Sequence, residues 1–246
     1  GLQSAVMVPV TIVDLNDNPT EFTQGEYRGD IVEHSSTGTP IFSVETADAD
    51  TVVSGVTLSV RAGGMYAAAE TLFGFASNDL VFVGNPADLD RDTLASYSFT
   101  IVVTDEDGQE DTAPATVTLL DINDNAPVFS QQEYTVNVPE DQALGVFFNS
   151  ISASDADAGE NAHVVYSLVS GNDAGKFDID AETGQLVLVD ALDYEMVQAY
   201  GLVVQAEDHG TPEAQSTQVS VTVNVEDVND NDPAFVKTSL SRSVFE

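Results

Sequence analysis

The sequence predicts an all-β protein built from tandem sandwich domains of about seven strands each. Stretches 115–119, 134–138 and 218–225 alternate polar with apolar residues and are rich in β-branched side chains, which is typical of half-buried strands. Turn-rich clusters such as 171–175 and 181–184 separate the strands, and no long helical periodicity competes with them. The 246 residues, 42% of them hydrophobic, suffice for roughly two domains with packed cores.

An acidic string recurs three times, as DLNDNP from Asp14, DINDNAP from Asp121 and DVNDNDP from Asp227. The copies are therefore 107 and 106 residues apart, which is too long for helical solenoid repeats and suits a sandwich domain. Other landmarks keep nearly the same spacing: the acids Glu33, Glu140 and Glu246, the aspartate pairs 48/50 and 155/157, and the elements 89–92 and 192–195.

The repeats divide the chain into four expected segments. Residues 1–18 are expected to supply the last strand and linker of a preceding repeat, 19–125 and 126–231 two complete repeats, and 232–246 the first strand of a following repeat, from Phe235 to Phe245. Neither end could build a core alone. We therefore expect the chain to be a fragment of a longer array.

The charge balance is strongly acidic. Six Lys and Arg residues stand against 42 Asp and Glu, which gives a formal net charge of -36. Self-repulsion on this scale opposes a compact state unless cations neutralise part of it. Nucleic acid and anionic membranes are disfavoured as partners because both need basic surfaces, and no apolar run is long enough to cross a membrane. Without cysteine, neither disulfides nor thiolate metal sites can stabilise the chain.

The repeated acids form a hard oxygen donor set. Asp, Glu, Asn and backbone carbonyls suit calcium, which takes six to eight oxygens, better than magnesium, which keeps its waters. Zinc or copper would favour His or Cys, and His34, His163 and His209 do not fall at matching repeat positions. His209, beside Asp208, is interpreted as a solvated loop residue. The sequence thus predicts calcium as the cofactor.

Several motifs occur in a fixed order: DINDNAPVF and DVNDNDPAF, the stretch DADAGENAHVVYSL, the element LDYE, and a V-x-A-x-D string that ends at Asp208. In this combination the whole chain resembles the extracellular repeats of cadherins. The resemblance implies seven-stranded Greek-key, Ig-like sandwiches joined by calcium-binding linkers. It also implies a cluster of three calcium ions at each junction between consecutive repeats.

Carried over residue by residue, the resemblance implies a complete junction around 121–125. The upstream ligands are Glu33, Asp90, Asp92, Asp121, the carbonyl of Ile122 and Asp124. The linker and the downstream repeat supply Asn123, the carbonyl of Asn125, Asp155, Asp157, the carbonyl of Asn161 and Asp208. Eight of these groups are carboxylates, and three calcium ions nearly neutralise them. Crowded carboxylates need such neutralisation because like charges disfavour ionisation.

The other two junctions are implied to be partial. At 14–18 the downstream ligands are Asn16, the carbonyl of Asn18, Asp48, Asp50 and Asp105. No counterpart of Asn161 follows Asp50, and a carbonyl near Ser54 is a possible substitute. At 227–231 the upstream ligands are Glu140, Asp193, Glu195, Asp227 and Asp230. Asp92 also departs from the family, which usually has Glu there, and its shorter side chain is expected to weaken bridging between the upstream ions.

The expected function is that of a calcium-dependent cell-adhesion ectodomain segment, extracellular and part of a single-pass plasma-membrane protein. Its partners would be other cadherin-type ectodomains, homophilic or heterophilic, bound through the parent array. The alternative is a non-adhesive spacer or glycan-binding module of a large surface protein. An enzyme with Asp90 and Asp92 as a glycosidase pair is disfavoured, because the acids lie at repeat junctions and no other catalytic motif is evident. Without Trp, the chain cannot carry the Trp-anchored strand exchange of the best-known members.

Overall fold

The computed structural model describes residues 3, 5–50 and 55–233 and divides into two compact units, Gly1–Ile122 and Asn123–Glu246. Strands dominate both units, and the predicted all-β class is confirmed. In the described part of the chain no helix is long and apolar enough to cross a membrane.

The first unit is a sandwich of two main sheets. One sheet has the order β2 (Tyr27–Val32), β9 (Glu110–Leu120), β8 (Ser96–Thr104) and β5 (Thr57–Arg61), with β2 and β9 parallel and the other pairs antiparallel. The second sheet has the order β3 (Pro40–Ser43), β7 (Asp79–Phe82) and β6 (Phe73–Ala76). The short strands β1 (Glu21–Phe22) and β4 (Thr46–Ala47) pair with each other.

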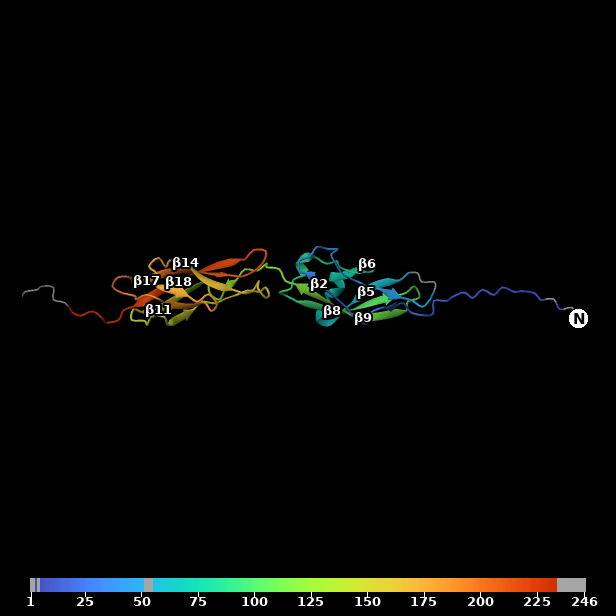
Figure 1. Ribbon diagram of the computed structural model, residues 1–246, viewed down its shortest axis with the longest axis horizontal. Coiled ribbons are helices and arrows are strands. Elements are labelled where there is room, and N and C mark those ends of the chain that lie inside the picture. The colour runs from blue at the N-terminus through green and yellow to red at the C-terminus, as the bar shows by residue number, and fades with distance from the viewer. Residues whose placement is uncertain (1–2, 4, 51–54, 234–246) are drawn as a thin grey trace, which may run out of the picture. The chain divides into compact units, whose positions relative to one another are not determined.

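The second unit repeats this arrangement. Its larger sheet has the order β11 (Glu133–Pro139), β18 (Ser216–Glu226), β17 (Ala199–Glu207) and β14 (Val165–Ser170). The second sheet has the order β12 (Phe147–Ser150), β16 (Gln185–Leu188) and β15 (Phe177–Ile179), and β10 (Val128–Phe129) pairs with β13 (Ala153–Ser154). Figure 1 shows the long hairpin strands β8 and β9 in the first unit and β17 and β18 in the second.

The shared topology confirms the predicted sandwich. In each unit the first strand of the sandwich is split into two segments, β1 and β2 or β10 and β11. The second strand is split in the same way, into β3 and β4 or β12 and β13. The nine segments that the described residues of each unit form therefore correspond to seven strands. The stretches 115–119, 134–138 and 218–225 lie within β9, β11 and β18, as expected from their alternation.

Two parts of the structure differ from the sequence-based expectation. The segment between β5 and β6 contains the 3-10 turn η1 (Gly64–Tyr66) and the helix α1 (Ala69–Leu72), and a second turn, η2 (Pro86–Asp88), precedes β8. Among the described residues before Glu21 no strand forms, because a strand there would need a neighbour from a preceding repeat. The strand expected at 235–245 lies outside the described residues.

Each unit has its own core, built from the inward-facing positions of its strands. In the first unit the ring of Phe73 lies 5.3 Å from the rings of both Tyr97 and Phe99. In the second unit Leu186 and Leu202 are fully buried. Burial of a side chain of this size contributes about 1.5–3 kcal/mol relative to exposure. These cores hold the sheets rigidly, so the loops at both ends of each sandwich have fixed starting points.

Candidate metal centres

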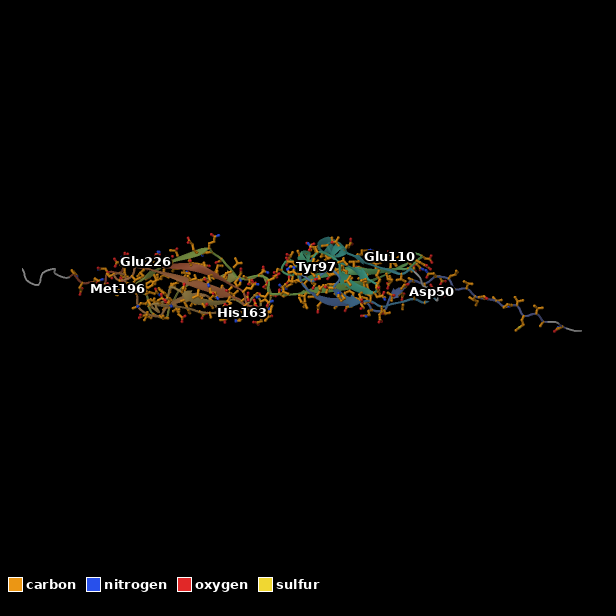
Figure 2. The ribbon with its side chains drawn as sticks, turned by 90° about the horizontal axis from the view of Figure 1, so that it is seen from above. Asp50, Tyr97, Glu110, His163, Met196 and Glu226 are labelled. Carbon is orange, nitrogen blue, oxygen red and sulfur yellow. The ribbon has the colours of Figure 1, made fainter. Side chains whose placement is uncertain are left out.

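The predicted ligands of each unit lie at the two ends of its sandwich. We call the set beside the incoming linker the entry cluster and the set beside the outgoing linker the exit cluster. Figure 2 shows Asp50 and Tyr97 at opposite ends of the first unit, and His163 and Met196 at opposite ends of the second. Asp50 belongs to an entry cluster, and Met196 directly follows the acids of an exit cluster.

The exit cluster of the first unit is organised by Glu33, which directly follows β2 and is 2% exposed. One carboxylate oxygen accepts the backbone N–H of Ile122 at 2.9 Å and the other accepts that of Arg91 at 2.7 Å. Glu33 therefore joins the loop before β8 to the linker that leaves β9. Because each oxygen retains a second lone pair, both can still face a cation.

The other acids of this cluster are also held by hydrogen bonds. Asp90 accepts the backbone N–H of Asp92 at 2.9 Å and the hydroxyl of Thr93 at 2.9 Å. The Thr93 hydroxyl is the main reason that the pKa of Asp90 is lowered, against a smaller opposing effect of burial. The Arg91 guanidinium lies 3.5 Å from the carboxylates of both Asp92 and Asp121. The cluster thus presents several carboxylate groups beside one guanidinium group.

The exit cluster of the second unit repeats this design around Glu140, which is 7% exposed. Its two oxygens accept the backbone N–H groups of Tyr194 at 2.7 Å and Val228 at 2.8 Å, the positions that correspond to Arg91 and Ile122. Both bonds lower the pKa of Glu140, and the bond from Tyr194 has the larger effect. Oxygens of Glu140, Asp193 and Glu195 lie within 4.8 Å of one another.

The linker that follows β18 approaches this exit cluster. The Asn231 amide donates to Glu195 at 2.9 Å and to Asp230 at 2.7 Å. Asp227 comes directly after β18 and is exposed. The structure therefore places the predicted ligand Asp230 near Glu195 through a shared amide.

In the entry cluster of the second unit, the linker is bound to the loop after β13. The backbone N–H and side-chain amide of Asn125 donate to the two oxygens of Asp157 at 3.3 and 2.7 Å, and the same amide reaches Asp124 at 2.7 Å. Asp155 accepts the backbone N–H of Asp157 at 3.0 Å. The side chain of Asn161 accepts the N–H of Thr211 at 3.3 Å. The second loop of the cluster, after β17, is thus tied to the first.

Asp208 is the most buried acid of this entry cluster, at 1% exposure. One of its oxygens accepts the side-chain amide of Asn123 at 3.1 Å and the backbone N–H groups of Gly210 and Gln215 at 2.8 and 3.0 Å. The Gln215 side chain in turn donates to the carbonyl of Asn123 at 2.8 Å. Asn123 is therefore fixed between two residues of the loop that joins β17 to β18.

The entry cluster of the first unit has the same arrangement of aspartates. Asn18 donates its backbone N–H and side-chain amide to Asp50 at 2.9 and 2.7 Å, and the N–H of Asp50 donates to Asp48 at 2.8 Å. Asp48 also accepts the Thr20 hydroxyl at 2.5 Å, which is the main reason that its pKa is lowered. The substitute carbonyl expected near Ser54 lies outside the described residues.

Asp105 completes this entry cluster and differs from its counterpart Asp208 in one contact. It accepts the backbone N–H groups of Asp107 and Gln109, both at 2.9 Å. The Gln109 side chain lies 3.5 Å from the carbonyl of Asn16, whereas the Asn16 amide donates to Asp107 at 2.9 Å. The recurrence of Gln109 as Gln215, at a shift of 106 residues, is a signal by which sequence comparison of the repeats could have identified this supporting residue.

The donor set fits calcium on two observations. Every buried acid in the described part of the chain belongs to a predicted ligand set: Glu33, Asp50, Asp105, Glu140, Asp157 and Asp208. In addition, one buried oxygen each of Asp105, Asn123, Asp155 and Asp208 accepts no hydrogen bond from the described residues. Burial of a charge is costly unless a partner compensates it. Clustered carboxylate and amide oxygens suit a hard cation that binds many oxygens.

Two sandwiches of one topology, each with clustered acids at its ends, define this chain as a tandem repeat of an acidic β-sandwich. A family model described as cadherin domain matches residues 134–226. The chain is 37% identical over 250 residues to Protocadherin Fat 2 of Mus musculus, and the match covers 100% of this chain and 6% of that protein. The chain thus spans only a small part of this curated relative.

Solved structures agree with this likeness. The Protocadherin gammaB7 EC3-6 cis-dimer structure matches with a TM-score of 0.79 and 30% identity over 93% of this chain and 54% of that one. The mouse clustered PcdhgC3 EC1-3 structure matches with a TM-score of 0.70 and 30% identity over 88% of this chain and 70% of that one. The chain belongs to the cadherin family and is an extracellular cadherin module. Repeats of this family bind calcium at their junctions and serve in adhesion ectodomains rather than as enzymes.

Proposed function

We propose that this chain is a segment of a calcium-dependent cell-adhesion ectodomain, in which calcium at the repeat junctions stiffens an extended array. The observation that supports this function most strongly is that, among the described residues, the buried acids all lie at the ends of the sandwiches. One buried oxygen each of Asp105, Asp155 and Asp208 also accepts no hydrogen bond from the described residues. Burial of carboxylate oxygens that accept no hydrogen bond is costly, and a bound cation would offset that cost.

The linker 121–125 is proposed to hold three calcium ions. Its upstream ligands, apart from Asp124, are those of the first exit cluster, and its downstream ligands are those of the second entry cluster. Each cluster is organised within its own unit by the hydrogen bonds described above. A ligand set drawn from both repeats removes hinge freedom from the linker, because the repeats cannot separate without losing ligands. The linkers at 14–18 and 227–231 are proposed to form partial sites in this chain.

The repeat boundaries follow the same assignment. Residues 19–125 and 126–231 are proposed to be complete repeats, and 1–18 and 232–246 to belong to neighbouring repeats. The partners are proposed to be other cadherin-type ectodomains, bound through the parent array at the surface of a plasma-membrane protein. Beads coated with the parent ectodomain should aggregate in calcium and disperse in EGTA, whereas aggregation in both conditions would contradict calcium-dependent adhesion.

The stiffening is tested by small-angle scattering of this chain in calcium and in EGTA. Calcium should narrow the distribution of interdomain distances, and Asp124→Ala should require more calcium to reach the same profile because it loses one linker carboxylate. Asp173→Ala, which removes an exposed acid outside every cluster, is the matched control. Superimposable wild-type profiles with and without calcium would refute the stiffening.

A further inference from the structure

The second unit contains a group of potential metal ligands that includes two histidines. Glu160 and His163 lie in the loop before β14, and His209 follows β17. Each of the three residues offers one potential ligand atom, and these three atoms lie within 4.8 Å of one another. The centroids of the two imidazole rings are 4.7 Å apart. All three side chains are exposed, so a dissolved ion can reach them. Figure 2 marks the place of this group at the end of the unit that carries His163.

Both imidazole rings are oriented by a hydrogen bond from one of their nitrogens. Nδ1 of His209 lies 3.2 Å from the carbonyl oxygen of His163, and only a protonated nitrogen can donate to a carbonyl. In the neutral ring this leaves the lone pair on Nε2 of His209. Nε2 of His163 lies 3.1 Å from a carboxylate oxygen of Glu182, which leaves the lone pair on Nδ1. Metal-binding histidines are commonly held in this way, by a carboxylate or carbonyl on the other nitrogen.

One further distance is close to the separation between two ligands of a small ion. Nδ1 of His163 is 3.8 Å from a carboxylate oxygen of Glu160. Two ligands of a tetrahedral zinc ion, bound at about 2.0–2.1 Å, lie roughly 3.3 Å apart. A small rotation of the exposed Glu160 side chain closes this difference. Imidazole nitrogen selects zinc, copper or nickel over calcium, which prefers oxygen.

We propose that Glu160, His163 and His209 form a binding site for a divalent transition metal, with zinc as the representative ion and Glu182 as the residue that orients His163. Water occupies the remaining coordination position, since the protein supplies three ligands. The site is particular to the second repeat, because Glu106 stands at the position of His209 in the first. It connects the loop before β14 with the loop after β17, so bound metal stabilises the folded repeat.

The test is a zinc titration of the tag-free chain by calorimetry, carried out in saturating calcium so that the oxygen clusters are occupied. The wild type should bind one zinc ion per chain, and zinc should raise the unfolding temperature. The double variant His163→Ala/His209→Ala should lose both effects. Glu182→Gln should retain the site and weaken it by about 10-fold to 100-fold, the usual cost of losing a partner that orients a ligand.

His34→Asn is the matched control, because it removes the remaining histidine and because Asn tolerates the positive φ of 54° at that position. This variant should bind zinc like the wild type. Circular dichroism and the calcium-dependent unfolding transition establish that each variant is folded. A folded double variant that binds zinc as tightly as the wild type would overturn the proposal, and so would loss of the single site in His34→Asn.

Discussion

Replacement of Asp208 by Asn tests the calcium assignment at its most buried carboxylate. Asp208 is 1% exposed, and one of its oxygens is surrounded by three N–H donors while the other accepts no hydrogen bond from the described residues. Asn preserves the size of the side chain, removes its charge and replaces one oxygen by an amide nitrogen. We therefore expect Asp208→Asn to leave the protein folded in EGTA and to remove the part of the stabilisation by calcium that comes from the ion bound at Asp208.

The size of the effect follows from binding to the folded state alone. Extracellular calcium modules have dissociation constants on the order of 10⁻⁴–10⁻³ M. At about 10 mM calcium one such ion then stabilises the folded repeat by about 1.4–2.7 kcal/mol. In a domain of roughly 100 residues, 1 kcal/mol shifts the unfolding temperature by about 4–8 °C. Loss of one ion should therefore lower the calcium-dependent rise of the unfolding temperature of the second repeat by roughly 6–22 °C.

Differential scanning calorimetry in calcium and in EGTA measures this difference directly. Asp173→Asn, which changes an exposed acid outside the clusters, should keep the full calcium-dependent rise. The reasoning fails if Asp208→Asn shows the same rise as the wild type. It also fails if Asp173→Asn loses as much as Asp208→Asn, because the effect would then come from net charge rather than from a site.

Three glycine substitutions give two further predictions. Gly184 and Gly175 share a φ of +64°, but a Cβ at Gly184 would meet the carbonyl oxygen of Ile151, whereas nothing lies within 4 Å at Gly175. Gly184→Ala should therefore cost more in urea unfolding than Gly175→Ala, whose cost is limited to about 1–2 kcal/mol of backbone strain, and equal costs would contradict the clash. A Cβ at Gly210 would meet the side chain of Asn123, so Gly210→Ala should weaken calcium binding in a titration without a large loss of stability in EGTA; unchanged affinity would argue against Asn123 as a ligand.

The strands and the acidic clusters were predictable from the sequence for different reasons. Strand positions follow from alternation, which is local, so β11 and β18 were found with few errors in their bounds. The clusters follow from acids that recur between the repeats at shifts of 103 to 107, together with the family resemblance that these motifs carry, and neither requires knowledge of contacts. Glu33 and Glu140 illustrate this, since each alone resembles a surface acid and yet both are buried.

Other features depend on contacts that no local pattern encodes. The helix α1 has four residues, too few to show a helical period, and is held by burial of Ala69 and Leu72. The neighbouring rings of His163 and His209 are 46 positions apart in the chain and belong to only one of the repeats, so neither spacing nor recurrence indicates them. Such features appear only when the loops at the end of a sandwich are brought together by the sheets.

The hydrogen bonds of the exit clusters indicate how calcium and folding are related. Glu33 and Glu140 each use both oxygens to accept backbone N–H groups from two separate segments, one before the penultimate strand and one after the last. These bonds form within a single repeat and require no cation, so the loops are organised before calcium binds. Calcium that binds afterwards therefore orders the sandwich little further, and its main effect is to order the linker. Calcium removal should therefore loosen the linkers while each sandwich keeps its strands, as seen by far-ultraviolet circular dichroism that does not change in EGTA.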